Sequence, residues 1–409
     1  MADTKYLIIG GGVASAKAAV AIRELDKDGR VILVTREDRY PYDRPPLSKD
    51  FLTNDKMTAE DPESKDPSWY VENNVEIRRA ATATHIDRSA HRVDFSDGQS
   101  LTYEKLLLTT GASPIKPDID GIELENVFFL RTIDDAENLR TAIKRGGTAV
   151  MIGGGYIGLE VSASATSRGV KCTVIDKQMR PWSSFASHGA GDFVRRRFEQ
   201  AGVRLVSDAA AVKIVGDGKV SAVRTLSGEE YAADFVVIGL GVKLNTQLAR
   251  DAGLNLDRQG AIVVDQYLLT SDPDIYAAGD VAAFPDKYSG AHTHLEHYLN
   301  GSWQGSIAGA NLAGESTPYD RVAYFYSDMF DIHMALRGAP GGTLARMFGA
   351  VESGTFVEIY AGPGGRLQMG LAVSTDESKL DPISDRLEAL IKVAETVDRI
   401  DPADFAAVA

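Results

Sequence analysis

Two glycine-rich segments carry the residue types best suited to binding a nucleotide. The second reads Gly153-Gly154-Gly155-Tyr156-Ile157-Gly158 and follows an apolar run at 148–152. Glycines at this spacing permit a sharp bend and a close approach to a pyrophosphate, and the next helix presents its N-terminal N–H groups to phosphate. Asp176 follows about 20 residues later, where an acid binds a ribose hydroxyl. The segment therefore predicts a dinucleotide site.

Asp176 also bears on which dinucleotide binds. A carboxylate beside the ribose would repel the 2′-phosphate of NADPH, so this residue favours NADH. Lys177 and Arg180 lie close in the sequence and would weaken that preference.

The first segment reads Gly10-Gly11-Gly12-Val13-Ala14-Ser15, with serine in the third glycine position. A small residue can replace that glycine, because its role is close helix packing. Glu37, further along the chain, is the expected ribose ligand. Two complete units predict two dinucleotides, and we expect one of them to be a tightly held FAD.

Both segments lie between elements that would position them. Strands are expected at 5–9, 30–35, 148–152 and 170–176, and helices at 14–25 and 157–168. This alternation predicts an α/β fold with parallel sheets. The proline-rich segment 40–48 is expected to be irregular. Strands at 356–360 and 367–373 and a helix at 387–397 predict a small C-terminal sheet with a helix behind it.

Composition excludes several classes of partner. The chain has 409 residues and a net charge of −14, which disfavours nucleic acid and anionic membranes, since both reward positive surfaces. No apolar run reaches the roughly 20 residues of a membrane helix, and no export signal opens the sequence. We expect a cytoplasmic protein, with the basic run 195–197 on a solvated helix face.

A single cysteine, Cys172, lies within an apolar run. One cysteine cannot form an intrachain disulfide or hold a thiolate-bound metal cluster. We expect Cys172 to be a buried, inert thiol and predict no metal site.

The proline-rich segment suggests a family. Pro41-Tyr42-Asp43-Arg44-Pro45-Pro46-Leu47-Ser48-Lys49 resembles the flavin loop of the oxygenase-coupled ferredoxin reductases. The segments that also match in order and spacing are 107–112, 130–136, 153–160, 276–281, 295–297 and 325–328. The resemblance implies two Rossmann-like dinucleotide-binding domains of the glutathione-reductase type and a small C-terminal α/β domain. The implied ranges are 1–113 with 243–318 for FAD, 114–242 for NAD, and 319–409 for the C-terminal domain.

The resemblance also implies roles for individual residues. Lys49 and Glu160 would pair beside the reacting edge of the flavin as the catalytic residues. FAD would contact Gly10, Gly12, Val13, Ala14, Glu37, Arg44, Lys49, Thr110, Gly111, Ala112, Arg131, Gly279, Asp280, Glu296, His297, Tyr298 and Tyr326. NAD would contact Gly153, Gly154, Gly155, Tyr156, Ile157, Gly158, Glu160, Asp176 and Gly241.

Several residues depart from the family pattern. Tyr324 and Tyr326 stand where the family usually has tryptophan, and His294 stands where it usually has arginine. Met329 and Phe330 replace glutamine and tyrosine. These departures leave the cofactors unchanged and bear on the partner.

Because the sequence offers no redox cysteine beside the flavin, we expect the electrons to pass to an external acceptor. Thiol-based reductases need a reactive cysteine beside the flavin, and the flavin loop here offers Ser48. We expect a [2Fe–2S] ferredoxin as acceptor, with a monodehydroascorbate-reductase-like or quinone-type small oxidant as the alternative. Asp328 stands where an arginine would help to bind an anionic oxidant. A redox-sensing flavoprotein like apoptosis-inducing factor is a second alternative. The oligomeric state, monomer or homodimer, stays open.

Overall fold

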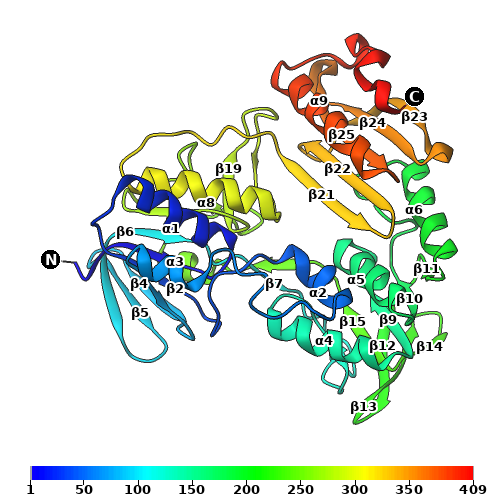
Figure 1. Cartoon of the computed structure of the whole chain (residues 1–409), viewed down its shortest axis with the longest axis horizontal. Coiled ribbons are helices and arrows are strands. Elements are labelled where there is room, and N and C mark those ends of the chain that lie inside the picture. Colours follow the sequence, from blue (N-terminus) through cyan, green and yellow to red (C-terminus); the bar gives the residue numbers. More distant parts are fainter. Residues whose placement is uncertain (1, 409) are drawn as a thin grey trace. The chain divides into compact units, whose positions relative to one another are not determined.

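The computed structural model describes residues 2–408, which separate into two units by their internal contacts (Figure 1). Unit 1 contains the residues up to Arg44, Glu60–Ser113 and Lys243–Arg321. Unit 2 contains Pro45–Ala59, Pro114–Val242 and the residues from Val322 onward. The three predicted domain ranges stay a prediction, and Met1 and Ala409 at their ends lie outside the described residues.

A seven-stranded sheet forms the centre of unit 1. Its strands are β1 (Thr4–Ile9), β2 (Val31–Val34), β3 (Val75–Arg78), β4 (Ala83–Asp87), β5 (Arg92–Phe95), β6 (Ser100–Leu108) and β18 (Ile275–Ala277). The order is β3-β2-β1-β6-β5-β4, and β18 pairs with β6. β1, β2, β3, β6 and β18 pair in parallel, whereas β4, β5 and β6 form an antiparallel edge. β2 is buried at every residue, as a parallel strand covered on both faces requires.

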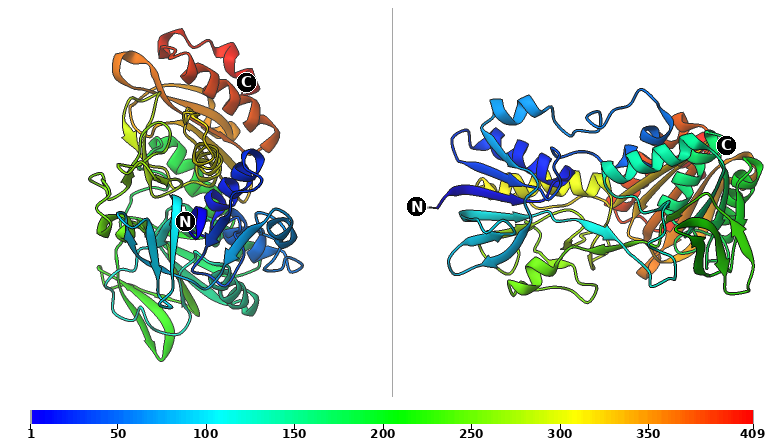
Figure 2. Two further views of the ribbon diagram at one scale, coloured as in Figure 1. Left: turned by 90° about the vertical axis from the view of Figure 1, so that its left-hand side faces the viewer. Right: turned by 90° about the horizontal axis from the view of Figure 1, so that it is seen from below.

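Helix α1 (Val13–Leu25) packs closely on helix α8 (Tyr298–Leu312), and the two run side by side in Figures 1 and 2. A Cβ at Gly305 would lie 2.3 Å from the carbonyl oxygen of Ala14, and one at Gly309 would lie 2.4 Å from that of Ala18. Glycine is therefore required at both positions. Unit 1 also holds α3 (Pro67–Glu72), α7 (Gln247–Asp251) and a small sheet of β17 (Ile262–Val263), β19 (Ala282–Pro285) and β20 (His292–Thr293).

A five-stranded parallel sheet forms one part of unit 2. Its order is β11-β10-β9-β15-β8, with β8 (Val127–Phe128), β9 (Thr148–Ile152), β10 (Lys171–Ile175), β11 (Arg204–Val206) and β15 (Phe235–Ile238). Beside it are α2 (Asp50–Thr53), α4 (Ile133–Arg145), α5 (Tyr156–Ser167) and α6 (His188–Gln200). An antiparallel sheet contains β12 (Ala211–Asp217), β13 (Lys219–Thr225) and β14 (Glu230–Ala232). The short strands β7 (Ala112–Pro114) and β16 (Val242–Leu244) lie where the chain passes between units.

The C-terminal part of unit 2 is an antiparallel sheet in the order β21-β22-β25-β24-β23. Its strands are β21 (Tyr324–Met329), β22 (Ile332–Gly338), β23 (Thr343–Ala350), β24 (Thr355–Ala361) and β25 (Leu367–Ser374), with α9 (Leu380–Lys392) packed on it. The expected helix at 387–397 was wrong at both ends. Pro382 lies in the first turn of α9, where its missing N–H costs nothing. Ala394 takes a φ of 52°, which ends the helix.

The expectation for the basic run 195–197 was also wrong for two of its three residues. Arg195 donates to the Met179 carbonyl and to Ser207 Oγ, and Arg197 pairs with Asp331. Only Arg196 is exposed. The α/β class with parallel sheets is confirmed. Within residues 2–408, no helix combines the length and apolar character needed to cross a membrane.

Candidate functional site

The first glycine turn joins β1 to α1 and leaves room for a ligand. Gly10 has a φ of 142°, and a Cβ there would lie 2.2 Å from the carbonyl oxygen of Thr109. Gly12 is the N-cap of α1 and makes no side-chain hydrogen bond to it. A Cβ on Gly12 would meet nothing within 4 Å. The N-cap of α1 therefore borders open space, which suits a pyrophosphate bound at the helix N-terminus.

Glu37 lies beyond β2 and is held by side chains. Tyr42 donates its hydroxyl to Glu37 Oε2 at 2.5 Å, and Arg44 donates to Oε1 at 2.9 Å. Arg44 also donates to the Tyr42 hydroxyl and stacks on its ring. Burial opposes the charge of Arg44, but Tyr42, Glu37 and Asp280 outweigh that cost and raise its pKa. The acid expected at the first ribose is thus fixed by an arginine and a tyrosine from the flavin loop.

The remaining residues of unit 1 expected at FAD lie in three ordered segments. Thr110 and Gly111 are joined to Asn245: Thr110 Oγ1 donates to its carbonyl at 2.7 Å, and the Asn245 N–H donates to the Gly111 carbonyl. Ala112 is buried. The N–H of Gly279, next to Asp280, donates to Gln304 Oε1 at 2.8 Å. Gln304 was not anticipated; its buried Nε2 has no partner among the described residues.

Three polar residues before α8 and the first residue of the helix bear on the FAD site. His297 caps α8, its Nδ1 accepting the N–H of Leu299 at 3.3 Å, and the Tyr298 hydroxyl donates to Asp43 at 2.9 Å. His294 Nε2 lies 3.1 Å from Glu296 Oε1. The hydrogen bond that His294 donates to Glu296 raises the pKa of His294 against the effect of burial, and the charges of Asp257 and Asp280 assist.

The second glycine turn joins β9 to α5. Gly153 has a φ of 106°, and a Cβ there would lie 2.4 Å from the Gly239 carbonyl oxygen. A Cβ on Gly158 would lie 1.9 Å from the carbonyl oxygen of Gly153, so the helix can begin here only with glycine. Gly155 is exposed and caps α5, and Ile157 is 38% exposed. Gly241 has a φ of 89°, and its carbonyl accepts the N–H of Ile115.

Asp176 closes this turn through backbone bonds. Its Oδ2 accepts the N–H of Gly154 at 3.0 Å, and its Oδ1 accepts the N–H of Gln178 at 3.0 Å. Asp176 and Gly154 line a surface hollow together with Leu159, Val174, Gln178, Arg180, Pro181, Leu205, Val206 and Ser207. An apolar floor with one acid at its rim suits the adenosine half of a dinucleotide.

Glu160 on α5 forms the centre of a polar network within unit 2. Its side chain is 10% exposed, and its two oxygens accept the hydroxyls of Ser48 and Ser327, each at 2.5 Å. Lys49 Nζ lies 3.6 Å from Glu160 Oε1 and 3.3 Å from Asp328 Oδ2. Lys49, from the flavin loop, is therefore shared between two carboxylates.

The network continues to His333, whose Nδ1 lies 2.8 Å from Asp328 Oδ1. Lys49 Nζ also lies 5.6 Å from the ring centre of Tyr326. Ser48, Ser327 and His333 were not anticipated. No spacing in the sequence links them, since β21 and β22 lie far from the flavin loop along the chain.

Aromatic rings cover the start of α5. The ring of Tyr156 lies 4.1 Å from that of Phe325 and is stacked on Phe185 at 5.6 Å. Burial raises the pKa of Tyr156, with a further contribution from Glu160. Arg131 precedes α4, and its backbone N–H donates to Asp135 at 3.1 Å. Arg131, Tyr326 and Lys49 thus belong to unit 2, whereas the other residues expected at FAD belong to unit 1.

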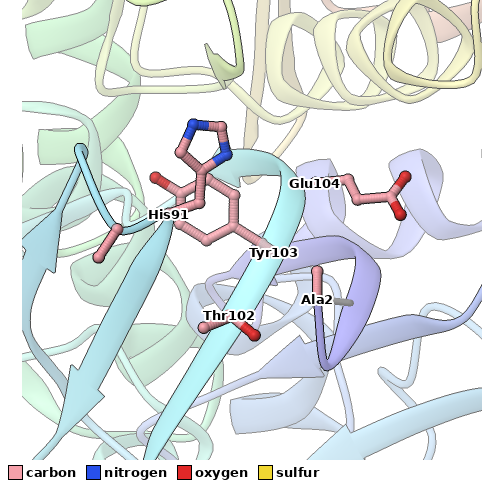
Figure 3. A pocket seen from close by; sticks show the side chains of 6 residues that line it. Ala2, His91, Thr102, Tyr103 and Glu104 are labelled. Atoms are coloured by element: carbon pink, nitrogen blue, oxygen red, sulfur yellow. The ribbon is translucent and has the colours of Figure 1, made fainter.

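Two further features lie apart from these residues. Figure 3 shows a surface hollow in unit 1 where the rings of His91 and Tyr103 are stacked at 5.4 Å. It contains no residue expected at either dinucleotide. Cys172 is 3% exposed in β10, and burial raises the pKa of its thiol to about 11, so it is the inert thiol that was expected. Within residues 2–408, no group of three or more His, Cys, Asp or Glu is placed to hold a metal ion.

Comparisons with known proteins identify the family of the chain. The family model described as pyridine nucleotide-disulphide oxidoreductase matches residues 4–305. The rubredoxin-NAD(+) reductase of Pseudomonas putida is 36% identical over 79% of this chain and 83% of its own. The ferredoxin--NAD(+) reductase component of the 3-phenylpropionate/cinnamic acid dioxygenase of Photorhabdus laumondii is 34% identical over 83% of this chain and 85% of its own.

A solved structure supports the same assignment. The covalent putidaredoxin reductase–putidaredoxin complex superposes with a TM-score of 0.89 at 28% identity, over 96% of this chain and 94% of the other. The fold expected from the resemblance is therefore confirmed. On the match over residues 4–305 and on these relatives, the chain belongs to the pyridine nucleotide-disulphide oxidoreductase family.

Proposed function

We propose that this protein oxidises NADH with a bound FAD and passes the electrons one at a time to a ferredoxin-type [2Fe–2S] protein of an oxygenase system. The NADH and FAD part of the proposal is carried by the coexistence of two nucleotide turns with a lysine–glutamate network and no accessible thiol. Two relatives are named as reductases of rubredoxin or of a dioxygenase ferredoxin, and a third was solved with putidaredoxin.

The glycine turns fit the two cofactors. Both α1 and α5 begin at a glycine N-cap without a side-chain hydrogen bond, so their N-terminal N–H groups are available to phosphate oxygens. Glu37 and Asp176 each follow the next strand, as ribose ligands do. We assign FAD to the turn at Gly10–Gly12 and NADH to the turn at Gly153–Gly158.

The Glu160 network would shape the hydride site. Bound FAD supplies the chemistry, because it accepts a hydride and releases electrons singly. Ser48 and Ser327 hold Glu160 in one rotamer, and Glu160 with Asp328 holds the ammonium of Lys49. A cation kept in one place by two carboxylates is a preorganised group, which costs little reorganisation during the reaction. We assign Lys49 and Glu160 as the residues of the hydride site.

Asp328 no longer decides between acceptors. In the sequence, its charge weighed against an anionic small oxidant. In the structure, its carboxylate lies 3.3 Å from Lys49 Nζ and 2.8 Å from His333 Nδ1, and the lysine, which also faces Glu160, offsets part of that charge. The choice of a ferredoxin rests instead on the relatives.

The test is NADH-dependent reduction of cytochrome c with and without each [2Fe–2S] ferredoxin of the same organism. One ferredoxin should stimulate the rate severalfold at low concentration. Equal rates with all of them would contradict the ferredoxin assignment, and slow turnover with every acceptor would favour a redox sensor. The proposal includes a cytoplasmic location, which cell fractionation checks.

A further inference from the structure

The hollow beside Asp176 contains one cation that could bind a 2′-phosphate. Arg180 lines the hollow with Asp176, whereas Lys177 is exposed and is not among the lining residues. An arginine at this place would reverse the selectivity that the acid provides, because guanidinium groups bind phosphate strongly and in a directed way. What Arg180 already binds therefore matters for cofactor choice.

Arg180 is engaged by a residue of helix α6. Its Nε donates to Asp192 Oδ1 at 2.8 Å. The helix lies close to this segment, since a Cβ on Gly191 would lie 2.7 Å from the Pro181 carbonyl oxygen and 3.0 Å from Arg180 Cβ. The pair is therefore placed by backbone packing rather than by two long side chains meeting in solvent.

A second contact from the same helix anchors the other end of the segment. Arg195 donates to the Met179 carbonyl and to the hydroxyl of Ser207, which also lines the hollow. Asp192 and Arg195 thus fix residues 179–181 from one side. Among the described residues that line the hollow, Arg180 is the one cation, and it is already paired with Asp192.

We propose that Asp192 is a specificity-determining residue, which withholds Arg180 from the 2′-phosphate of NADPH and so reinforces the preference for NADH set by Asp176. The proposal rests on the assignment of the NADH site to the second glycine turn. Two carboxylates then discriminate against NADPH in different ways: Asp176 repels the phosphate, and Asp192 occupies the group that would attract it.

The test measures ligand binding to the FAD-loaded protein by calorimetry, with 5′-AMP and adenosine 2′,5′-bisphosphate as probes. Asp192→Asn keeps the size of the side chain and releases Arg180. It should tighten binding of the bisphosphate about tenfold and leave 5′-AMP within about twofold, since both side chains of the pair are partly exposed and solvent screens the gain. The ratio of kcat/KM for NADPH to that for NADH should rise by a similar factor.

Two further variants separate the explanations. Glu199→Gln, on an exposed site of α6, removes the same charge and should leave the bisphosphate affinity unchanged. Arg180→Gln added to Asp192→Asn should abolish the gain. An unchanged ratio of bisphosphate to 5′-AMP affinity in Asp192→Asn, or an equal gain in Glu199→Gln, would overturn the role of Asp192. Absence of 5′-AMP binding in the unmodified protein would overturn the nucleotide site itself.

Discussion

The two glycine turns follow one plan but differ in how each acid is held. Glu37 accepts hydrogen bonds from the side chains of Tyr42 and Arg44, which come from the flavin loop. Asp176 is held by backbone N–H groups of Gly154 and Gln178 beside a small surface hollow. The first arrangement surrounds the acid with side chains, as suits a ligand that stays. The second leaves the acid accessible, as suits a ligand that comes and goes.

The turns also achieve close packing in different ways. In the second, the glycine lies in the helix itself, and a Cβ on Gly158 would overlap the carbonyl of Gly153. In the first, Ser15 takes that place and donates to the Gly12 carbonyl at 2.6 Å. Here the glycines that allow close packing lie on the partner helix α8, at Gly305 and Gly309. The third glycine of the motif therefore serves close packing, and small residues on either of the two helices in contact can provide the room for it.

The largest expected effect comes from a substitution that tests whether the two turns differ in their packing. Gly158→Ala forces a Cβ to within 1.9 Å of a carbonyl oxygen, and such overpacking costs about 1–3 kcal/mol. We expect 5′-AMP binding by calorimetry to weaken at least about tenfold while FAD content, from flavin absorbance, is kept. Ser15→Gly, the matching change in the first turn, should keep both. Loss of FAD in Ser15→Gly would show that the turns do not differ in this way.

A second substitution tests the division between the two acids. Asp176→Ala should raise the KM for NADH about tenfold, because a hydrogen bond to a charged group is lost, and it should narrow the preference over NADPH. Glu37→Gln should reduce the FAD content of the purified protein and leave the KM of the FAD-loaded fraction unchanged. Steady-state kinetics with both dinucleotides measure this. If Asp176→Ala leaves the preference for NADH over NADPH unchanged, Asp176 is not the ribose ligand.

Ser327→Ala tests whether the network around Glu160 serves the NADH step. It removes one of the two hydroxyls bound to Glu160, a loss of about 1 kcal/mol. We expect flavin reduction by NADH in stopped flow to slow about three- to tenfold, with unchanged FAD content. Ser167→Ala is the control, because this α5 hydroxyl donates to the Ser164 carbonyl of its own helix rather than to Glu160. Equal rates in the two variants would count against the assigned site.

The smallest effect concerns the pH response of unit 1. The pKa of His294 is raised, first by its hydrogen bond with Glu296, so the protonated ring stabilises the folded state. That contribution is complete below about pH 6.5, the unfolded pKa. It is lost as the pH rises through the higher folded pKa. His294→Gln should flatten this part of the stability–pH profile in thermal melts, whereas the exposed His292→Gln should not.

Local patterns predicted the parts of the site that lie on one stretch of chain. Both strand–turn–helix units formed where they were expected, because the glycine spacing and the apolar strands are short-range signals. The ribose-binding roles of the acids after them stay a prediction. The Lys49–Glu160 contact followed only from resemblance, since 111 positions along the chain separate them. Ser327, His333 and Asp192 were missed, because their roles depend on which strand or helix packs beside them.

Two misjudged segments show the same limit. Arg195 and Arg197 looked like solvent-facing charges, yet carbonyl and carboxylate groups from other elements bind them. Helix α9 begins before its apolar pattern is evident, with a proline in its first turn. By contrast, the spacing of Gly301, Gly305 and Gly309 every four residues places all three on one face of a helix and so indicates a close helix contact.

The contact between α1 and α8 has a consequence for how the protein is made. The ribosome delivers α1 first, but α8 begins at Tyr298, and β18, which completes the sheet of unit 1, begins at Ile275. At typical synthesis rates, the early strands and α1 wait on the order of 15–60 s for these partners. During that time, the parallel sheet of residues 127–238 can form on its own chain segment. Unit 1 can therefore be completed only after the segment that forms the parallel sheet of unit 2 has been synthesised.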